Sequence, residues 1–182
     1  MKFLGTKQIE TERLILRKFT LDDAEGVYNN WATDSNTNKY LSWSIHKDVN
    51  ETKEVISNWI KEYEKGSYNW IVELKDTHEV IGSICEQGKN LKHKTISLGY
   101  NYGSKFWNKG YATEALRRVI EYLLKEQDFY LVEANHRSSN PASGRVMQKA
   151  GMKYDGTLRD RRLDIDGKRA DMLYYSITKN EF

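Results

Sequence analysis

The segment from Lys94 to Asn135 constrains the fold more than any other part of the sequence. It begins with a strand-like run, KTISLGYNYG, and ends with another, FYLVEAN. Between them, apolar residues recur at helical spacing along one face: Ala112, Ala115, Leu116, Val119, Ile120, Leu123 and Leu124. A strand, an amphipathic helix and a second strand in this order predict a right-handed crossover between two parallel strands.

The remaining elements surround this crossover. Five further strands are expected, at 13–19, at 69–74, at 79–85 and as the two arms of a hairpin over 156–178. Three further helices are expected, at 21–32, 50–66 and 140–151. Consecutive strands favour antiparallel pairing. We therefore expect an α+β fold (an α/β mixed sheet) in a single domain over residues 1–182. Its twisted, mostly antiparallel sheet is expected to have about seven strands, flanked by about four helices.

Composition excludes several kinds of protein. The 29 basic residues barely exceed the 26 acidic ones, which argues against nucleic acid as a direct partner. No apolar run approaches the roughly 20 residues that cross a bilayer, so we expect no membrane partner and a cytoplasmic location. The four His show no metal-ligand spacing, and the single Cys85 is expected to be a small core residue. No metal and no covalent catalysis are predicted.

The loop WNKGYAT (107–113) stands directly before the long helix. Gly110 can adopt backbone conformations closed to other residues, and Ala112 offers almost no steric barrier. Free amides at the start of a helix, with Lys105 and Lys109 nearby, form a site suited to phosphate or pyrophosphate. An ordinary solvated helix start fits this short pattern equally well.

Two further features flank this loop. Gly99 interrupts its strand and marks either a bulge or a close approach of another backbone. In NPASGR, Asn140 is most simply the helix N-cap and Ser143 a hydroxyl of the first turn. A serine at that place can also donate to a nearby thiolate or oxyanion.

Taken in order, SLGYNYG, WNKGYATEAL and NPASGRVMQKAGMKYDG resemble the GNAT N-acetyltransferase superfamily. The branch that looks closest is that of the ribosomal-protein-alanine N-acetyltransferases, which ETERLILRKF and DGTLRDRRLD also resemble. The resemblance spans about Glu10 to Thr178. It implies an enzyme that transfers the acetyl group of acetyl-CoA to a primary amine by direct attack.

The resemblance also implies roles for particular residues. The superfamily loop pattern Gln/Arg-x-x-Gly-x-Gly/Ala maps onto 107–112, with Trp107 in place of Gln or Arg, and its amides would hold the pyrophosphate. The strand at 98–100 would pair with the pantetheine arm, and Ser143 would donate a proton to the departing thiolate. The implied cofactor-binding residues are Leu98, Gly99, Tyr100, Trp107, Asn108, Lys109, Gly110, Tyr111, Ala112, Thr113, Asn140 and Ser143.

The acid–base groups are less clear. In many relatives a Glu stands where this chain has Ser97, so a base at that point is missing. A lysine-like amine has a pKa of about 10.4 and an N-terminal amine one of about 8, so the latter needs less help to lose its proton. Three carboxylates are candidates to assist, with Asp160 preferred: Glu133, Asp160 and Asp164. The side chains of Trp31, Tyr40, Trp43 and His46 either pack in the core or line an acceptor groove.

The sequence leaves the acceptor open between a protein N-terminus and a small amine such as a polyamine, an antibiotic or an amino acid. A CoA-binding or RNA-associated module without efficient transfer is the rival hypothesis. A homodimer is also left open.

Overall fold

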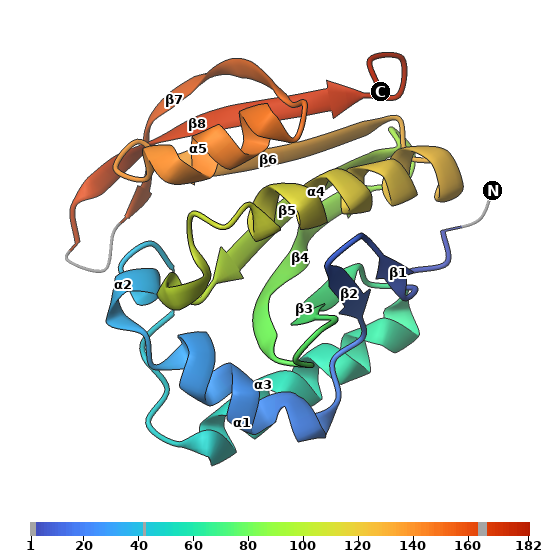
Figure 1. Cartoon of the computed structure of the whole chain (residues 1–182). Coiled ribbons are helices and arrows are strands. Elements are labelled where there is room, and N and C mark those ends of the chain that lie inside the picture. Colours follow the sequence, from blue (N-terminus) through green and yellow to red (C-terminus); the bar gives the residue numbers. More distant parts are fainter. Residues whose placement is uncertain (1–2, 42, 164–166) are drawn as a thin grey trace.

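The structure is a computed structural model that describes residues 3–41, 43–163 and 167–182. Over these ranges, eight strands form one sheet in the order β1-β2-β3-β4-β5-β6-β8-β7 (Figure 1). Their bounds are β1 (Ile9–Glu10), β2 (Leu14–Arg17), β3 (Asn69–Leu74), β4 (Val80–Asn90), β5 (Thr95–Tyr102), β6 (Leu131–Arg137), β7 (Lys153–Leu163) and β8 (Arg169–Thr178). All neighbours pair antiparallel except β5 and β6, which are parallel. The predicted α+β class and parallel crossover are confirmed.

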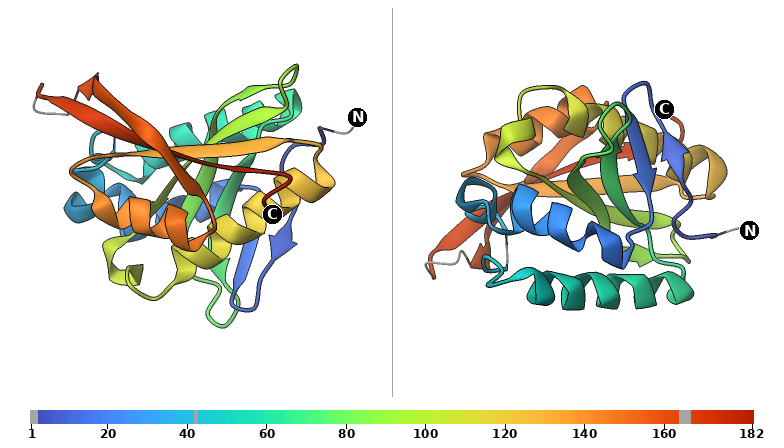
Figure 2. Two further views of the ribbon diagram at one scale, coloured as in Figure 1. Left: turned by 90° about the horizontal axis from the view of Figure 1, so that it is seen from above. Right: turned by 60° about the horizontal axis from the view of Figure 1, so that its bottom comes forward.

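Helices cover both faces of this sheet (Figure 2). On one face lie α4 (Tyr111–Glu121) and α5 (Pro141–Lys149); on the other lie α1 (Ala24–Val27) and α3 (Val49–Glu62), with the short α2 (Ser35–Asn38) between them in the chain. Short turns of 3-10 helix occur at Leu21–Asp23, Tyr63–Lys65 and Ser104–Phe106, and π-helical turns at Tyr28–Ala32 and Tyr122–Glu126.

The core explains why these elements pack as they do. The predicted stripe on α4 is buried against the sheet, and Leu116, Val119 and Leu123 are fully inaccessible to solvent. Leu14 and Leu16 of β2 face the same layer, as their alternation predicts. A second cluster around Trp31, Ile56 and Ile71 fills the opposite face, under α1 and α3.

Three details differ from the sequence-based expectations. The sheet has an additional strand, because the two residues of β1 pair with β2. The helix expected at 21–32 is a succession of 3-10, α and π turns. The backbone bulge is not at Gly99, where β5 keeps its pairing with Cys85, but on β4 between Glu86 and Gly88.

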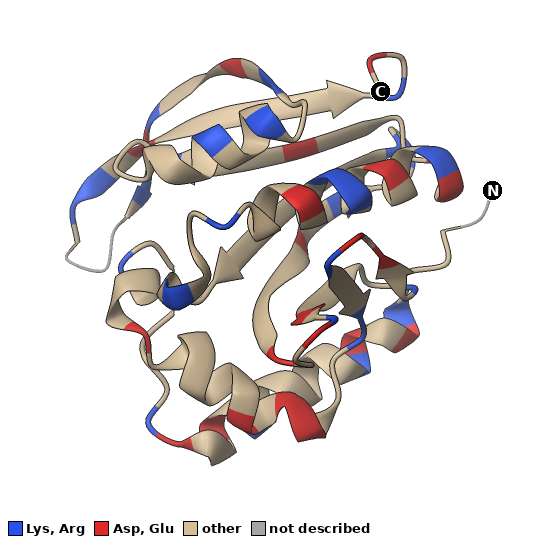
Figure 3. Ribbon diagram, viewed as in Figure 1, with Lys and Arg blue, Asp and Glu red and all other residues tan. Residues whose placement is uncertain are grey.

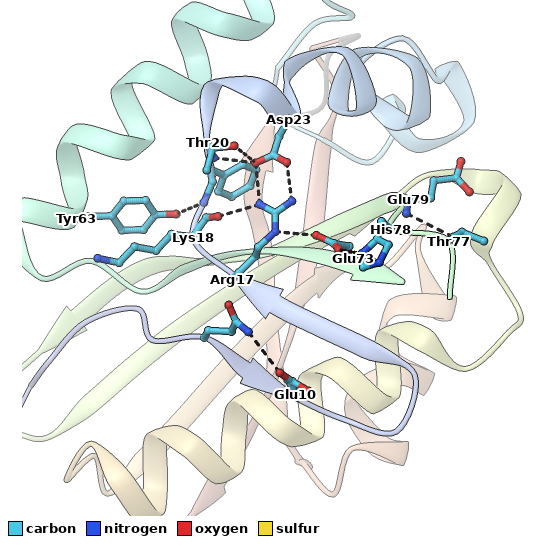
Figure 4. A network of polar contacts seen from close by, with 12 residues as sticks. Glu10, Arg17, Lys18, Thr20, Asp23, Tyr63, Glu73, Thr77, His78 and Glu79 are labelled. Atoms are coloured by element: carbon cyan, nitrogen blue, oxygen red, sulfur yellow. Dashed lines mark hydrogen bonds and ion pairs between the residues drawn. The ribbon is translucent and has the colours of Figure 1, made fainter. Parts of the chain in front are cut away.

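A buried ionic network holds the segment before α1 onto the sheet (Figure 4). The Arg17 guanidinium donates to both oxygens of Asp23, at 2.9 and 2.7 Å, and to Glu73 at 2.7 Å. Asp23 and Glu73 are both more than nine-tenths buried. The hydrogen bond with Asp23 raises the pKa of Arg17, whereas burial lowers it by a smaller amount, so the pKa is raised overall. This network links β2, β3 and the start of the helical layer.

Candidate active site

The parallel pair β5–β6 separates before either strand ends. Their pairing runs only from Thr95 with Leu131 to Leu98 with Ala134. Beyond that point β5 continues to Tyr102 on β4, while β6 continues to Arg137 on β8. Figure 1 shows the two strands diverging. The backbone of β5 past Leu98 therefore has no strand partner on its β6 side within the described chain, which leaves polar groups available to a ligand.

A groove of about 1030 Å³ lies at this divergence. Alternate residues of the two strands line it: Ser97, Gly99, Asn101, Glu133 and Asn135. Tyr100, His136, Asn140 and Ser143, which belong to or face α5, also line it. Because residues from both faces of the sheet contribute, the groove passes between the two strands. The predicted residues Leu98, Gly99, Tyr100, Asn140 and Ser143 are thus brought together.

A side chain of the neighbouring strand lies close to Gly99. A Cβ on Gly99 would lie 2.8 Å from the side-chain amide nitrogen of Gln87, the residue that forms the bulge of β4. Neither sequence-based alternative for Gly99 holds at that residue, because the bulge lies on β4 and the group that approaches Gly99 is a side chain rather than another backbone.

Tyr100 and Ser143 form a hydrogen-bonded pair in the groove. The Tyr100 hydroxyl donates to the Ser143 carbonyl at 2.8 Å and lies 2.9 Å from Ser143 Oγ. Since a phenol has one proton, Ser143 Oγ–H then donates to Tyr100. Burial raises the pKa of Tyr100, and the bond to Ser143 opposes it. Asn140 is the N-cap of α5, its Oδ1 accepting from the Ser143 amide at 3.4 Å.

The predicted anion loop stands at the same edge of the sheet. Parallel strands end at the same edge, so the helices that follow β5 and β6 both begin there (Figure 1). Asn108 and Gly110 both adopt positive φ, at 61° and 83°. Over the described residues no side chain caps α4, so the amides of Tyr111, Ala112 and Thr113 are not engaged by the helix. The loop lies outside the lining of the groove itself.

Two sets of contacts hold this loop in place. Glu114, in the first turn of α4, accepts from Thr11 Oγ1 and from the Arg13 amide and guanidinium, while Arg13 Nη1 donates to the Lys109 carbonyl. Burial raises the pKa of Glu114, but the hydrogen bonds from Thr11 and Arg13 outweigh it and lower the pKa below its ordinary value. The Trp107 indole donates to the Tyr102 carbonyl at 2.7 Å, so this departure from the family pattern ties the loop to the end of β5.

In the segment before α3, some aromatic side chains line the groove and others pack in the core. Tyr40 and Trp43 line the groove, together with Trp59. Trp31 is only 1% exposed and packs in the second core cluster. His46 is buried with its Nδ1 2.8 Å from Thr52 Oγ1. The interpretation as groove lining therefore fits Tyr40 and Trp43, and the interpretation as packing fits Trp31 and His46.

The three candidate carboxylates lie in different places. Glu133 lines the groove, opposite Ser97 in the parallel register. Asp160 lies on an exposed, irregular part of β7 with φ at 52°, its amide bonded to Asp171, and is outside the groove lining. Asp164 lies outside the described residues. The geometry therefore favours Glu133 over Asp160.

Cys85 lines the groove as well, which its strand position did not indicate. Burial raises the pKa of its thiol to about 11, so the nucleophilic thiolate is scarce near neutral pH. Other groove residues that the sequence did not single out are Glu62, Glu86, Lys89, His136, Arg161 and Arg162. They come from four separate elements, and no local motif connects them.

Comparison with known proteins identifies the family. The model of the acetyltransferase (GNAT) domain matches residues 13–153. The chain belongs to the GNAT acetyltransferase family. It is 30% identical over 172 residues to the uncharacterized N-acetyltransferase YoaA of Bacillus subtilis, covering 94% of this chain and 96% of that protein. The crystal structure of a GNAT acetyltransferase from Bacillus anthracis is 28% identical, covers 96% of this chain and 99% of that one, and superposes with a TM-score of 0.84.

The resemblance to the ribosomal-protein branch is also confirmed. The [ribosomal protein uS5]-alanine N-acetyltransferase of Escherichia coli is 33% identical over 81 residues, which cover 44% of this chain and 41% of that enzyme. Among the described residues, no helix is long and apolar enough to cross a membrane. Within those same ranges, no three His, Cys, Asp or Glu side chains are grouped as metal ligands. Acidic and basic residues are interspersed over the ribbon (Figure 3).

Proposed function

We propose that the protein transfers the acetyl group of acetyl-CoA to a primary amine. The observation that carries this proposal is the divergence of β5 from β6 beside an uncapped helix start. The diverging strand offers backbone groups to the amides of a pantetheine arm, and the start of α4 offers amides to a pyrophosphate. Both sites lie at one edge of the sheet, as a single extended donor molecule requires.

The donor-binding residues follow from this placement. Leu98, Gly99 and Tyr100 pair with the pantetheine arm, and Asn140 contacts it from the start of α5. The loop residues Trp107, Asn108, Lys109, Gly110, Tyr111, Ala112 and Thr113 surround the pyrophosphate. A Gly with positive φ at the helix start keeps the approach to these amides open.

The reaction needs an unprotonated amine and a stabilised thiolate. The amine nitrogen attacks the thioester carbonyl, the new C–N bond forms and the C–S bond breaks. Glu133, or a water molecule held by it, takes the proton that the nitrogen loses, and the thiolate gains a proton through the Tyr100–Ser143 pair. Glu133 takes the role for which the sequence favoured Asp160.

The acceptor side of the groove is lined by Tyr40, Trp43 and Trp59. The relatives of the ribosomal-protein branch make a protein N-terminal α-amine the first acceptor class to test. This amine also has the lowest ordinary pKa of the candidate amines, so it needs the least help from a base to lose its proton. A small amine such as a polyamine, an antibiotic or an amino acid is the second class.

Acetyl-CoA consumption with a panel of N-terminal peptides and small amines tests the proposal. We expect the release of CoA thiol to rise with at least one acceptor, and mass spectrometry to find the product 42 Da heavier. Ser143→Ala is expected to lower kcat more than it weakens acetyl-CoA binding, with Ser139→Ala, on the exposed turn before α5, as the matched control. Tight CoA binding without release on any acceptor would favour the rival hypothesis of a binding module.

A further inference from the structure

Two neighbouring arginines of β7, Arg161 and Arg162, line the groove from the far end of the β7–β8 hairpin. Both residues are exposed. Figures 1 and 2 show this end of the hairpin extending past α5, on the side of the molecule where α2 lies. Within the described ranges, no hydrogen bond or ion pair engages either guanidinium. Two positive charges therefore face the groove with no protein anion of that part of the chain bound to them.

An irregularity in β7 brings both side chains to the groove. Successive residues of a regular strand point to opposite faces of the sheet. Here residues 159–161 of β7 stand opposite the single residue Asp171 of β8. The Asp171 carboxylate accepts from the Asp160 amide at 2.9 Å, and Arg169 donates to the Asp160 carbonyl at 3.0 Å. Because a bulge of this kind redirects side chains, both arginines can line the same groove.

The groove also contains a carboxylate without a partner. The side chain of Glu133, the proposed base, has no hydrogen bond or ion pair with any residue that the structure describes. The other two acidic side chains of the lining are paired, Glu86 with Lys89 at 3.0 Å and Glu62 with Lys65 at 2.7 Å. A free carboxylate near the strand divergence and two free guanidiniums at the hairpin end complement an acceptor that carries both an amine and an anionic group.

The distance between these charges indicates the size of the acceptor. Glu133 pairs with Ser176 of β8, and Arg162 pairs with Ala170 of β8, so the two rows are 176 − 170 = 6 residues apart. At about 3.3 Å per residue, this separation is about 20 Å along the strands. A free amino acid is far too short to span it, whereas about six extended peptide residues are long enough. A polyamine carries only positive charges, which the arginines repel.

We propose that the acceptor is a peptide N-terminus followed, within about its first six residues, by an acidic side chain that Arg161 and Arg162 bind. This inference rests on the proposed function, because it takes the reacting amine to lie beside Glu133. From there the peptide runs along the groove toward the hairpin end, where its carboxylate accepts charge-assisted hydrogen bonds from the guanidiniums. The two arginines are thus binding residues that select the acceptor and take no part in the chemical step.

An aspartate scan of the acceptor tests this assignment. Peptides of one length carry a single Asp at successive positions and are compared with their Asn counterparts. We expect kcat/KM to favour Asp about three- to tenfold at the best position, and this preference to shrink as the salt concentration rises. The double variant Arg161→Gln/Arg162→Gln should lose the preference, and Arg161→Glu/Arg162→Glu should favour Lys over Asp. Arg159→Gln, on the same strand but outside the groove lining, is the matched control and should keep it.

A second measurement needs no turnover. The acetylated product peptides, titrated into the protein with CoA present, should show the same order of Kd values. Equal kcat/KM and equal Kd for Asp and Asn peptides at every position, or a preference that the double Gln variant retains, would overturn the inference while leaving the proposed function intact. Faster transfer to spermidine or to free glutamate than to any peptide would also overturn it. If no amine is acetylated at all, the proposed function is wrong, and this inference fails with it.

Discussion

Replacing Gly144 by alanine should destabilise the protein, although the same change usually stabilises a helix. In an unobstructed helix interior, alanine is favoured over glycine by about 1 kcal/mol. Here the new Cβ would lie 2.5 Å from His136 Nε2, and ordinary contact begins at 3.4 Å, so the two groups must separate by 3.4 − 2.5 = 0.9 Å. The ring is held by its bond to Arg137 and its stacking on Tyr175, so α5 has to move instead.

Overpacking of this kind costs about 1–3 kcal/mol, which exceeds the gain in helix propensity over most of that range. We therefore expect a net loss of up to about 2 kcal/mol and a fall in Tm of up to about 8 °C for a chain of this size. Because Asn140 and Ser143 move with α5, the Kd for acetyl-CoA should rise as well. Thermal unfolding followed by circular dichroism, with a CoA titration on the folded variant, measures both effects.

Gly156→Ala is the matched control, because a Cβ at that glycine meets nothing within 4 Å. Its effect on stability should stay within about 0.5 kcal/mol. In the background of His136→Ala, the ring is gone and Gly144→Ala should become neutral or stabilising, a coupling that a double-mutant cycle detects. A higher Tm for Gly144→Ala in the otherwise unchanged protein would refute the placement of His136 against α5.

Three further changes test other parts of the structure. Gly110→Glu adds a carboxylate at the start of α4 and should weaken CoA binding at least about tenfold. Gly110→Ala, the control, adds only backbone strain. Equal calorimetric affinities of the two variants for CoA would contradict the pyrophosphate site. Asp23→Asn breaks the buried ion pair with Arg17 and should lower the free energy of unfolding, measured by urea denaturation, by about 2–4 kcal/mol. Glu62→Gln, which breaks the exposed pair with Lys65, should lower it by less than about 1 kcal/mol. Because burial raises the pKa of Cys85 to about 11, its labelling by a disulfide reagent should be slow at pH 7 and accelerate as pH rises toward 11. Rapid labelling at pH 7 would contradict so high a pKa.

The sequence predicted the features that depend on local chemistry. The stripe on α4 and the N-cap and Pro of α5 can be read from periodicity and capping rules, and both are present. The left-handed Gly66 that ends the turn after α3 also follows from such rules. Order along the chain was enough to predict the parallel crossover.

Features that depend on contacts between distant elements could not be predicted in the same way. The bulge falls on β4 rather than at Gly99 because the register of two strands decides where the extra residue goes. Glu133 and Asp160 are indistinguishable as sequence, and only the sheet shows that Glu133 faces the groove. The contact between His136 and Gly144 could not be predicted from the local sequence either, because the two residues lie eight positions apart on different elements.

Amide hydrogen exchange with and without acetyl-CoA tests the central claim, that the diverging strand and the start of α4 bind the donor. The account predicts slower exchange at the amides of β5 past Leu98 that point away from β4, and at Tyr111, Ala112 and Thr113. Exchange in β2 and β3, which lie far along the sheet from β6, should not change. Unaltered exchange at both predicted segments under saturating acetyl-CoA would contradict the account.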